Sequence, residues 1–157
     1  MSYTWLKFLH IAAVFALLAT HGVSMVALYA IRKERDRARI MAMVTLSGQT
    51  VTPMYISIGA ILVFGIWLWL TVYTLSTMWI WASIVILVLT IGLMTATAKP
   101  YFARVKEACQ LRPSGVPRVS DEELGEVLNS SRAHLITAIG VIGLAAILYL
   151  MVFKPKL

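Results

Sequence analysis

The charged residues of this chain are confined to a few short stretches, and their absence elsewhere constrains the fold more than any other feature. All seven acidic residues, and eleven of the fourteen lysines and arginines, fall within residues 32–39 and 99–132. Long apolar segments without a carboxylate lie between these stretches. A charge at the centre of a bilayer is costly, so the apolar segments are predicted to span a membrane and the charged stretches to lie outside it.

Four segments are long and apolar enough to cross a bilayer. A helix rises ~1.5 Å per residue, so about 20 residues cross a hydrocarbon core of ~30 Å. The sequence therefore predicts an all-α integral membrane protein, a four-helix bundle that forms one domain. The first segment is too long for the apolar part of a cleaved signal peptide, so we expect it to remain as a span. The predicted spans are residues 5–31, 53–73, 78–98 and 133–153, and the predicted loops are residues 32–52 and 99–132.

Prolines mark three of the predicted helix ends. Thr52 followed by Pro53 is a start signal, with the threonine as the N-cap and the proline at the first helical position. Pro100 is expected to end the third span, and Pro155 the fourth, because proline lacks the amide that continues a helix.

The short link between the second and third spans predicts the topology. Only residues 74–77 separate them, so we expect an antiparallel helical hairpin. Both charged loops then lie on one side, which the positive-inside rule assigns to the cytoplasm, with the N-terminus and the C-terminus outside. Tryptophans agree, because all five map to the outer ends of the first three spans and predict an aromatic belt there. They are Trp5, Trp67, Trp69, Trp79 and Trp81.

The predicted loops carry helical signals of their own. After a proline- and glycine-containing breaker at residues 112–117, Ser120 and Glu123 have the spacing of a capping box. Leu124 and Leu128 follow at helical spacing, which predicts a short amphipathic cytoplasmic helix before the fourth span. In the first loop, apolar residues suggest that the first helix continues, or that another begins along the membrane surface. These residues are Ile40, Met41, Met43 and Val44.

Composition excludes several classes of protein. The net charge of +7 is explained by basic residues that flank the spans, so we expect no binding to nucleic acid. The single cysteine, Cys109, excludes an internal disulfide and a cysteine-rich zinc site. No span carries a carboxylate of the kind that ion-coupled transporters use. No catalytic motif or metal-ligand spacing is present, so we predict no catalytic residue and no metal site.

Three histidines are the candidate cofactor ligands. His10 and His21 lie on one face of the first span, ~16 Å apart, and His134 begins the fourth span. Axial haem ligands must face each other at one depth, which rules out His10 with His134. His21 and His134 differ in depth by ~12 Å, or by ~5 Å if the inner end of the first span protrudes. A haem is therefore one hypothesis. The alternative, which we favour, is that His21 bonds to a neighbouring backbone or hydroxyl group, such as that of Ser24, and that the other two are interfacial.

Small residues recur on two spans. On the first span they occur at four-residue spacing, and they let helices approach closely. This stripe is either a homodimer seam or a packing surface within the bundle, and we expect packing. The residues are Ala12, Ala16, Thr20 and Ser24 on the first span, and Ala138, Gly140, Gly143, Ala145 and Ala146 on the fourth.

Short motifs at both ends resemble known families. Residues 5–11 (WLKFLHI) resemble the first span of several small bacterial membrane families, including the copper-resistance D-like proteins and the HemJ-type protoporphyrinogen oxidases. Residues 21–24 (HGVS), 32–36 (RKERD) and 148–155 (LYLMVFKP) are most similar to the uncharacterised DUF2269 family of integral membrane proteins. This resemblance implies four spans in a bacterial plasma membrane and no established activity.

The HemJ-type resemblance implies a role for one histidine. His10 matches the first-span histidine that is implicated in haem binding in that family. The arginine-rich motif that follows the first span in the family is not reproduced here. Its third-span lysine has no match within the span, since Lys99 lies at the end. We therefore do not transfer that activity to this chain.

These observations favour a non-catalytic structural or accessory subunit. Its partners would be the lipid bilayer together with another membrane protein or a second copy. The second hypothesis is a redox protein that holds haem or engages a porphyrin or quinone through His10, His21 or His134. The third is a carrier for a small solute or a metal.

Overall fold

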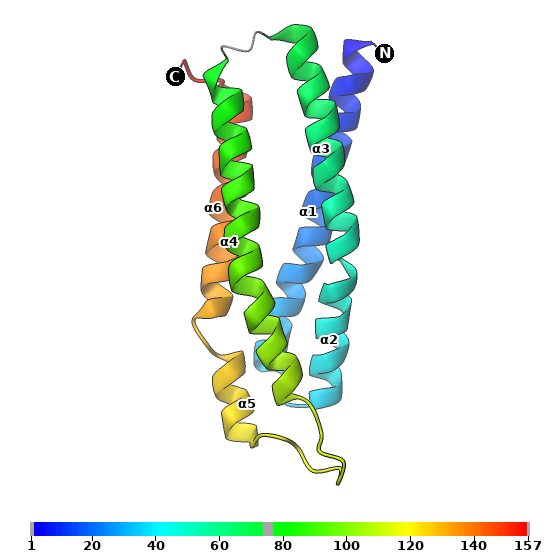
Figure 1. The fold of residues 1–157 in the computed structure, drawn as a ribbon, viewed down its shortest axis with the longest axis vertical. Helices are drawn as coiled ribbons and strands as arrows, with labels where there is room; N and C mark the ends of the chain where they lie inside the picture. Colours follow the sequence, from blue (N-terminus) through cyan, green and yellow to red (C-terminus); the bar gives the residue numbers. More distant parts are fainter. Residues whose placement is uncertain (1, 74–76, 157) are drawn as a thin grey trace.

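The computed structural model describes residues 2–73 and 77–156, which form six α-helices and no strand (Figure 1). Four helical stretches are long and apolar enough to cross a membrane, which confirms the predicted all-α class and the number of candidate spans. Both chain ends lie at the same end of the molecule, opposite α5. The helices are α1 (Tyr3–Lys33), α2 (Arg37–Gln49), α3 (Val51–Val72), α4 (Met78–Ala108), α5 (Asp121–Leu128) and α6 (Arg132–Phe153).

The charged stretch after α1 is more helical than predicted. It contains α2, which runs almost directly into α3, so most of the predicted connecting segment, residues 32–52, is helical. Asp36 caps α2, because its carboxylate accepts hydrogen bonds from two backbone amides of the first turn at 2.8 and 3.4 Å. Ile40 and Val44 are buried and hold the helix against the rest of the protein. The apolar pattern noted in this stretch therefore does mark a second helix.

The start of the second span differs from the prediction by two residues. Thr50, not Thr52, is the N-cap, and the helix begins at Val51. Pro53 is then the third helical residue. The first four amides of a helix have no partner within it, so a proline is tolerated there.

The third span continues through its proline. Pro100 lies inside α4, which ends only at Ala108, so the predicted end near Lys99 was wrong. A proline inside a helix costs about 3 kcal/mol. Burial of Tyr101 and Val105 on the following turns offsets this cost. At the other end of the chain, α6 stops at Phe153 as predicted.

The four long helices form two pairs. α3 packs along α1, and α4 packs along α6. Figure 1 shows α3 and α4 running antiparallel, as predicted, but neither has the other as its main neighbour. They meet through aromatic rings, since the Trp69 and Trp81 centroids are 5.0 Å apart and those of Tyr73 and Trp79 are 5.5 Å apart. Two tryptophans predicted for the aromatic belt, Trp69 and Trp79, are therefore buried inside the protein.

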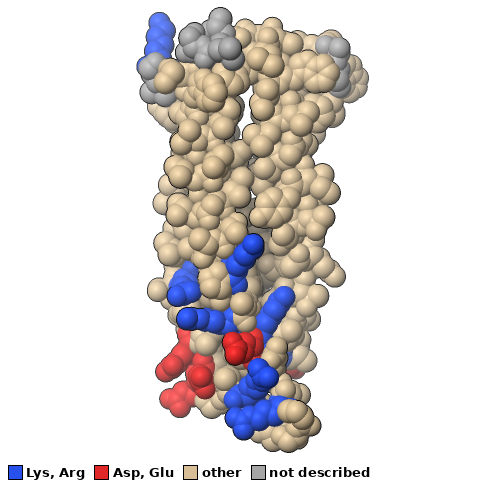
Figure 2. Space-filling view, viewed as in Figure 1, with Lys and Arg blue, Asp and Glu red and all other residues tan. Residues whose placement is uncertain are grey.

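The main buried cluster lies at the end where the charges gather. Figure 2 shows the acidic side chains and most of the basic ones at this end. Cys109 is part of the cluster, although the sequence places it in a charged loop. Parts of α1, α2, α4, α5 and α6 meet here. The cluster consists of Leu28, Ile31, Ile40, Val44, Tyr101, Val105, Ala108, Cys109, Leu124, Leu128, Ala133 and Ile136.

Two contacts shape the segment between α4 and α6. The hydroxyl of Ser120 accepts a hydrogen bond from the Glu123 amide at 3.1 Å, as the capping-box spacing predicts. Leu124 and Leu128 of α5 are buried. Arg37 of α2 reaches across to this segment, where it donates to the Val119 carbonyl at 2.9 Å.

Candidate functional site

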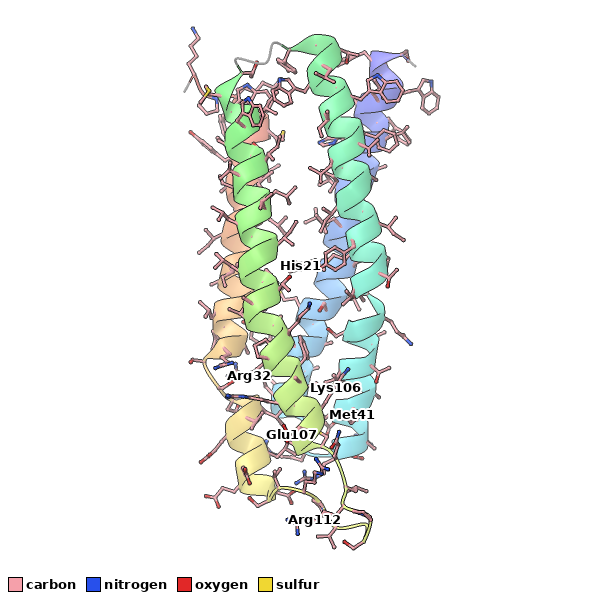
Figure 3. The ribbon with its side chains drawn as sticks, in the orientation of Figure 1. His21, Arg32, Met41, Lys106, Glu107 and Arg112 are labelled. Carbon is pink, nitrogen blue, oxygen red and sulfur yellow. The ribbon has the colours of Figure 1, made fainter. Side chains whose placement is uncertain are left out.

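His21 lies midway along the bundle (Figure 3), and its ring packs against α6 at Gly140. A Cβ built on Gly140 would lie only 2.8 Å from the histidine Nε2, so glycine permits this close approach. The Nε2 atom is buried and has no hydrogen-bond partner within the described residues. A buried polar atom without a partner costs about 1–3 kcal/mol. The Nε2 of His21 therefore needs a bound water or ligand atom.

The predicted partner of His21 is engaged elsewhere. The hydroxyl of Ser24 lies 2.7 Å from the hydroxyl of Ser47 on α2, so the two serines pair with each other. Ser47 is itself buried. This contact connects α1 to α2. Ser24 is therefore not the partner of the His21 imidazole, which lies beside a cavity.

A cavity of about 40 Å³ adjoins the His21 ring. A water molecule needs roughly 10–15 Å³ of such volume, so the cavity has room for one or a few waters. The Thr137 hydroxyl donates to the Ala133 carbonyl at 3.1 Å, which leaves its oxygen able to accept a further bond. The cavity is lined by His21, Ser24, Met25, Leu28, Met94, Ala98, Phe102, Ile136 and Thr137.

His10 occupies a similar setting against a different helix. Its ring packs on Gly65 of α3, where a built Cβ would lie 2.9 Å from Cε1. Its Nδ1 is 3.0 Å from the Ile61 carbonyl oxygen. A carbonyl can only accept, so the Nδ1 of His10 carries a proton and donates to it. His10 and His21 therefore contact α3 and α6 respectively, although both come from α1.

His134 is exposed and does not face His21. Its Nδ1 is 3.5 Å from the Tyr29 hydroxyl, and the two ring centroids are 5.9 Å apart. Gly140, against which His21 packs, lies six residues further along α6, or ~9 Å. The structure thus places the three histidines at separate positions and brings no two of them together.

The small residues of α6 and α1 behave differently. Gly143 of α6 contacts Thr90 of α4, where a built Cβ would lie 2.8 Å from the threonine Cγ2, so the expected close approach exists there. Ala12 and Ala16 of α1 are exposed, and the expectation that they pack within the bundle was wrong. A neighbouring stripe that includes Leu17 is buried instead.

A second cavity, of about 210 Å³, lies at the charged end between α4, α5 and α6. The sequence did not reveal it, because its basic residues flank the spans, where they are expected to set the orientation and to meet anionic lipid headgroups without forming a cavity. Arg104 and Arg132 are far apart in the chain, and α5 has to fold back along α4 to bring them to one cavity. The lining residues are Tyr101, Arg104, Glu126, Val127, Ser130 and Arg132.

Comparison with known proteins adds no relative. No protein-family model, no curated protein and no solved structure matches this chain. The resemblance to the DUF2269 family therefore stays a prediction that depends on short motifs. Function has to be argued from the geometry described above.

Proposed function

We propose that this chain is a non-catalytic accessory subunit that packs against another membrane protein or a second copy of itself. Its proposed location is the bacterial plasma membrane, and its proposed relatives are the DUF2269 family. The observation that carries the proposal is the exposed pair Ala12 and Ala16 on α1. Small side chains let a second helix approach closely, and van der Waals packing drives helix association in lipid. If this face of α1 met only lipid, larger apolar residues would serve equally well there, so the small residues favour a partner helix.

The sparse packing within the chain supports the same proposal. In the most apolar part of each span, at most 22% of the residues are buried inside the protein. Phe8 and Phe15 of α1 are exposed beside the alanines, at 58% and 68%. A smooth strip bordered by large aromatic side chains is the shape that a helix of a partner can fill.

Ala16→Leu is expected to weaken association at least tenfold while it leaves the fold intact. Ala16 is exposed, so the added bulk has no neighbour within the chain, and the free energy of unfolding should change by less than about 0.5 kcal/mol. The fraction of dimer or partner complex after cross-linking in mild detergent measures the effect. Ala138→Leu, at an exposed alanine of α6, is the control. If both variants associate as well as the wild type, the alanines face lipid and the proposal fails.

The proposed orientation puts both termini outside and the charged end in the cytoplasm. Basic residues dominate that end, as the positive-inside rule requires. In this orientation α5 lies at the cytoplasmic end of the bundle, beside α4, as an amphipathic helix. Its buried residues Leu124 and Leu128 face the bundle, and Glu122 and Glu126 are exposed to water.

Cysteine labelling tests the orientation. Cys109 is a poor probe, because burial excludes reagents and raises the pKa of its thiol. In a Cys109→Ser background, Ser114→Cys in the exposed loop should react with an impermeant maleimide only after the cells are opened. Ser2→Cys, at the opposite end of the molecule, should react in sealed cells. The reverse pattern would invert the topology.

A ligand-binding role at His21 is the second candidate function. The unpartnered Nε2 and the adjoining cavity favour it. A porphyrin is far larger than the 40 Å³ available, so a haem on His21 would need α1 and α6 to separate. The residues as placed suit a water or a small polar ligand better than a macrocycle.

His21→Phe separates the two candidate functions. We expect a folded variant with unchanged partner binding, because the substitution removes the unpaired Nε2 and keeps an aromatic ring. The visible spectrum and the melting temperature in mild detergent are the measurements. His134→Phe, at an exposed histidine, is the control. A Soret band in the wild type that His21→Phe abolishes would contradict the accessory role and support a haem protein.

A further inference from the structure

The cavity at the charged end presents basic groups from two helices. Arg104 projects from α4 and Arg132 from the start of α6, and both line the same space of about 210 Å³. Ser130 adds a hydroxyl from the junction between α5 and α6. The Tyr101 hydroxyl donates to the Leu128 carbonyl at 3.3 Å, so it fixes the wall of the cavity. This cavity is several times larger than the one beside His21.

The positive charge of this cavity is not neutralised by the protein. Within the described residues, the ion pairs are made by Arg37 and Arg39, and neither Arg104 nor Arg132 has one. Glu126 is the only carboxylate in the lining, and it forms no ion pair with either arginine. The lining groups therefore carry a net positive charge.

Arg32 of α1 lies near the wall of this cavity, although it is not one of the lining residues. It is close enough to Tyr101 for an electrostatic interaction with the hydroxyl. Its Nη1 is buried and has no hydrogen-bond partner in the part of the chain that the structure describes. Figure 3 shows Arg32 at the level of the junction between α5 and α6. An unpaired donor of this kind is costly, and an anion nearby would stabilise it.

The depth of the cavity in the membrane identifies the kind of anion. Arg104 follows the start of α4 by 26 residues, or ~39 Å, which exceeds the ~30 Å hydrocarbon core. Arg132 opens α6, a helix of 22 residues that spans ~33 Å. Both arginines therefore lie at the level of the lipid headgroups at one membrane surface.

We propose that this cavity binds the phosphate group of an anionic lipid headgroup in the adjacent leaflet. Guanidinium groups form short, charge-assisted and often bidentate hydrogen bonds with phosphate oxygens. Basic pockets between spans at a membrane surface are suited to such headgroups. The inference requires that the helices span a membrane, and it is independent of the proposed accessory role.

Lipid titration monitored by native mass spectrometry tests this site. The whole protein in neutral detergent should retain phosphatidylglycerol more tightly than phosphatidylcholine. Arg104→Gln and Arg132→Gln should each weaken phosphatidylglycerol binding about tenfold or more, since each removes charged hydrogen bonds. Lys106→Gln removes the same charge from an exposed position of α4 outside the cavity, and it should weaken binding by about fivefold at most, the general surface effect.

A substitution that is expected to tighten lipid binding distinguishes a change at the site from damage to the structure, because damage can only weaken binding. Glu126→Gln removes the one carboxylate of the lining and should tighten phosphatidylglycerol binding by about fivefold. Arg132→Lys keeps the charge but loses the bidentate geometry, so it should fall between the wild type and Arg132→Gln.

The same measurements can overturn the proposal. Equal losses in Arg104→Gln, Arg132→Gln and Lys106→Gln would show general attraction to an anionic surface without a site. Inorganic phosphate that displaces the lipid at millimolar concentration, with no preference for phosphatidylglycerol over phosphatidylcholine, would identify a soluble phosphate compound as the ligand. Unchanged association in the Ala16→Leu and Ala138→Leu variants would contradict the accessory role, and it would leave this result unaffected.

Discussion

Gly143→Ala is expected to destabilise the α4–α6 pair by about 1–3 kcal/mol, because the added methyl group has no space. A Cβ built at this position would lie 2.8 Å from Cγ2 and 3.1 Å from Cβ of Thr90, and closer still to its hydroxyl oxygen. The Thr90 side chain cannot turn away freely, since its hydroxyl donates to the Ile86 carbonyl at 2.7 Å. The helices would have to move apart.

Gly92→Ala is the matched control, with the opposite sign. Gly92 lies in the middle of α4, as Gly143 does in α6, but a Cβ built at Gly92 meets no atom within 4 Å. Alanine loses less conformational entropy than glycine when a helix folds, so this variant should gain about 0.5–1 kcal/mol. Unfolding in mixed micelles compares the two. Equal shifts in the same direction would mean that α6 does not approach α4 closely at Gly143.

Gly140→Ala should have a smaller effect than Gly143→Ala for a reason that is specific to the site. The obstructing atoms are the Nε2 and Cε1 of His21, at the end of a side chain. The cavity beside His21 gives that ring some room to move. The comparison separates close backbone approach from contact with a movable side chain.

The spans could be predicted because charge is so costly within a bilayer. The absence of carboxylates from the apolar segments located the four spans without any knowledge of their packing. The helix ends were harder. Pro100 predicts a helix end on local grounds, but burial of Tyr101 and Val105 extends α4 past it. Tertiary contacts of this kind leave no local signal.

The sequence could not predict which helices pair. A helix in lipid is apolar on all sides, so no polar face shows which side is turned away from the other helices. Gly140 and Gly143 do mark a packed surface of α6, whereas the equally small Ala12 and Ala16 are exposed on α1. Small apolar side chains suit a surface packed within the chain, a surface that contacts a partner and a surface that contacts lipid. For the histidines, the sequence identified His21 as a polar residue within an apolar span that needs a partner, but not its contact with Gly140, which depends on how α1 crosses α6.

The arginine cavity was missed for a different reason. Arg104 and Arg132 come together only because α5 folds back along α4, and a basic residue near a span end already has an explanation in membrane orientation. A signal was present in the sequence nonetheless. The stretch between them contains an N-cap at Ser120 and two leucines that need a surface to cover them.

Arg37→Gln is expected to destabilise the charged end by about 2–3 kcal/mol, through loss of hydrogen bonds from a charged donor to backbone carbonyls. The Arg37 side chain is only 14% exposed. Its guanidinium donates to the Ala108 carbonyl at the end of α4 and to the Val119 carbonyl just before α5. It therefore connects α2 to both ends of the loop between α4 and α5.

The ion pair of Arg37 contributes less than its carbonyl bonds. Its partner Asp121 is 90% exposed at a distance of 2.7 Å, and an exposed pair is worth about 1 kcal/mol at most. Asp121→Asn should thus have a small effect. Arg39→Gln is the second control, since its side chain is 72% exposed and its ion pairs are 3.7 and 3.8 Å long, and it should cost less than about 0.5 kcal/mol.

Limited proteolysis supplies a local measurement of the same contact. Without the Arg37 bonds, the segment between α4 and α5 is held by fewer backbone contacts, of which Arg118 N–H to the Gln110 carbonyl at 3.0 Å is one. Cleavage by trypsin after Arg118 should therefore accelerate in Arg37→Gln before the spans unfold. Cleavage at the wild-type rate, together with unchanged unfolding, would mean that the buried leucines of α5 alone hold this end together.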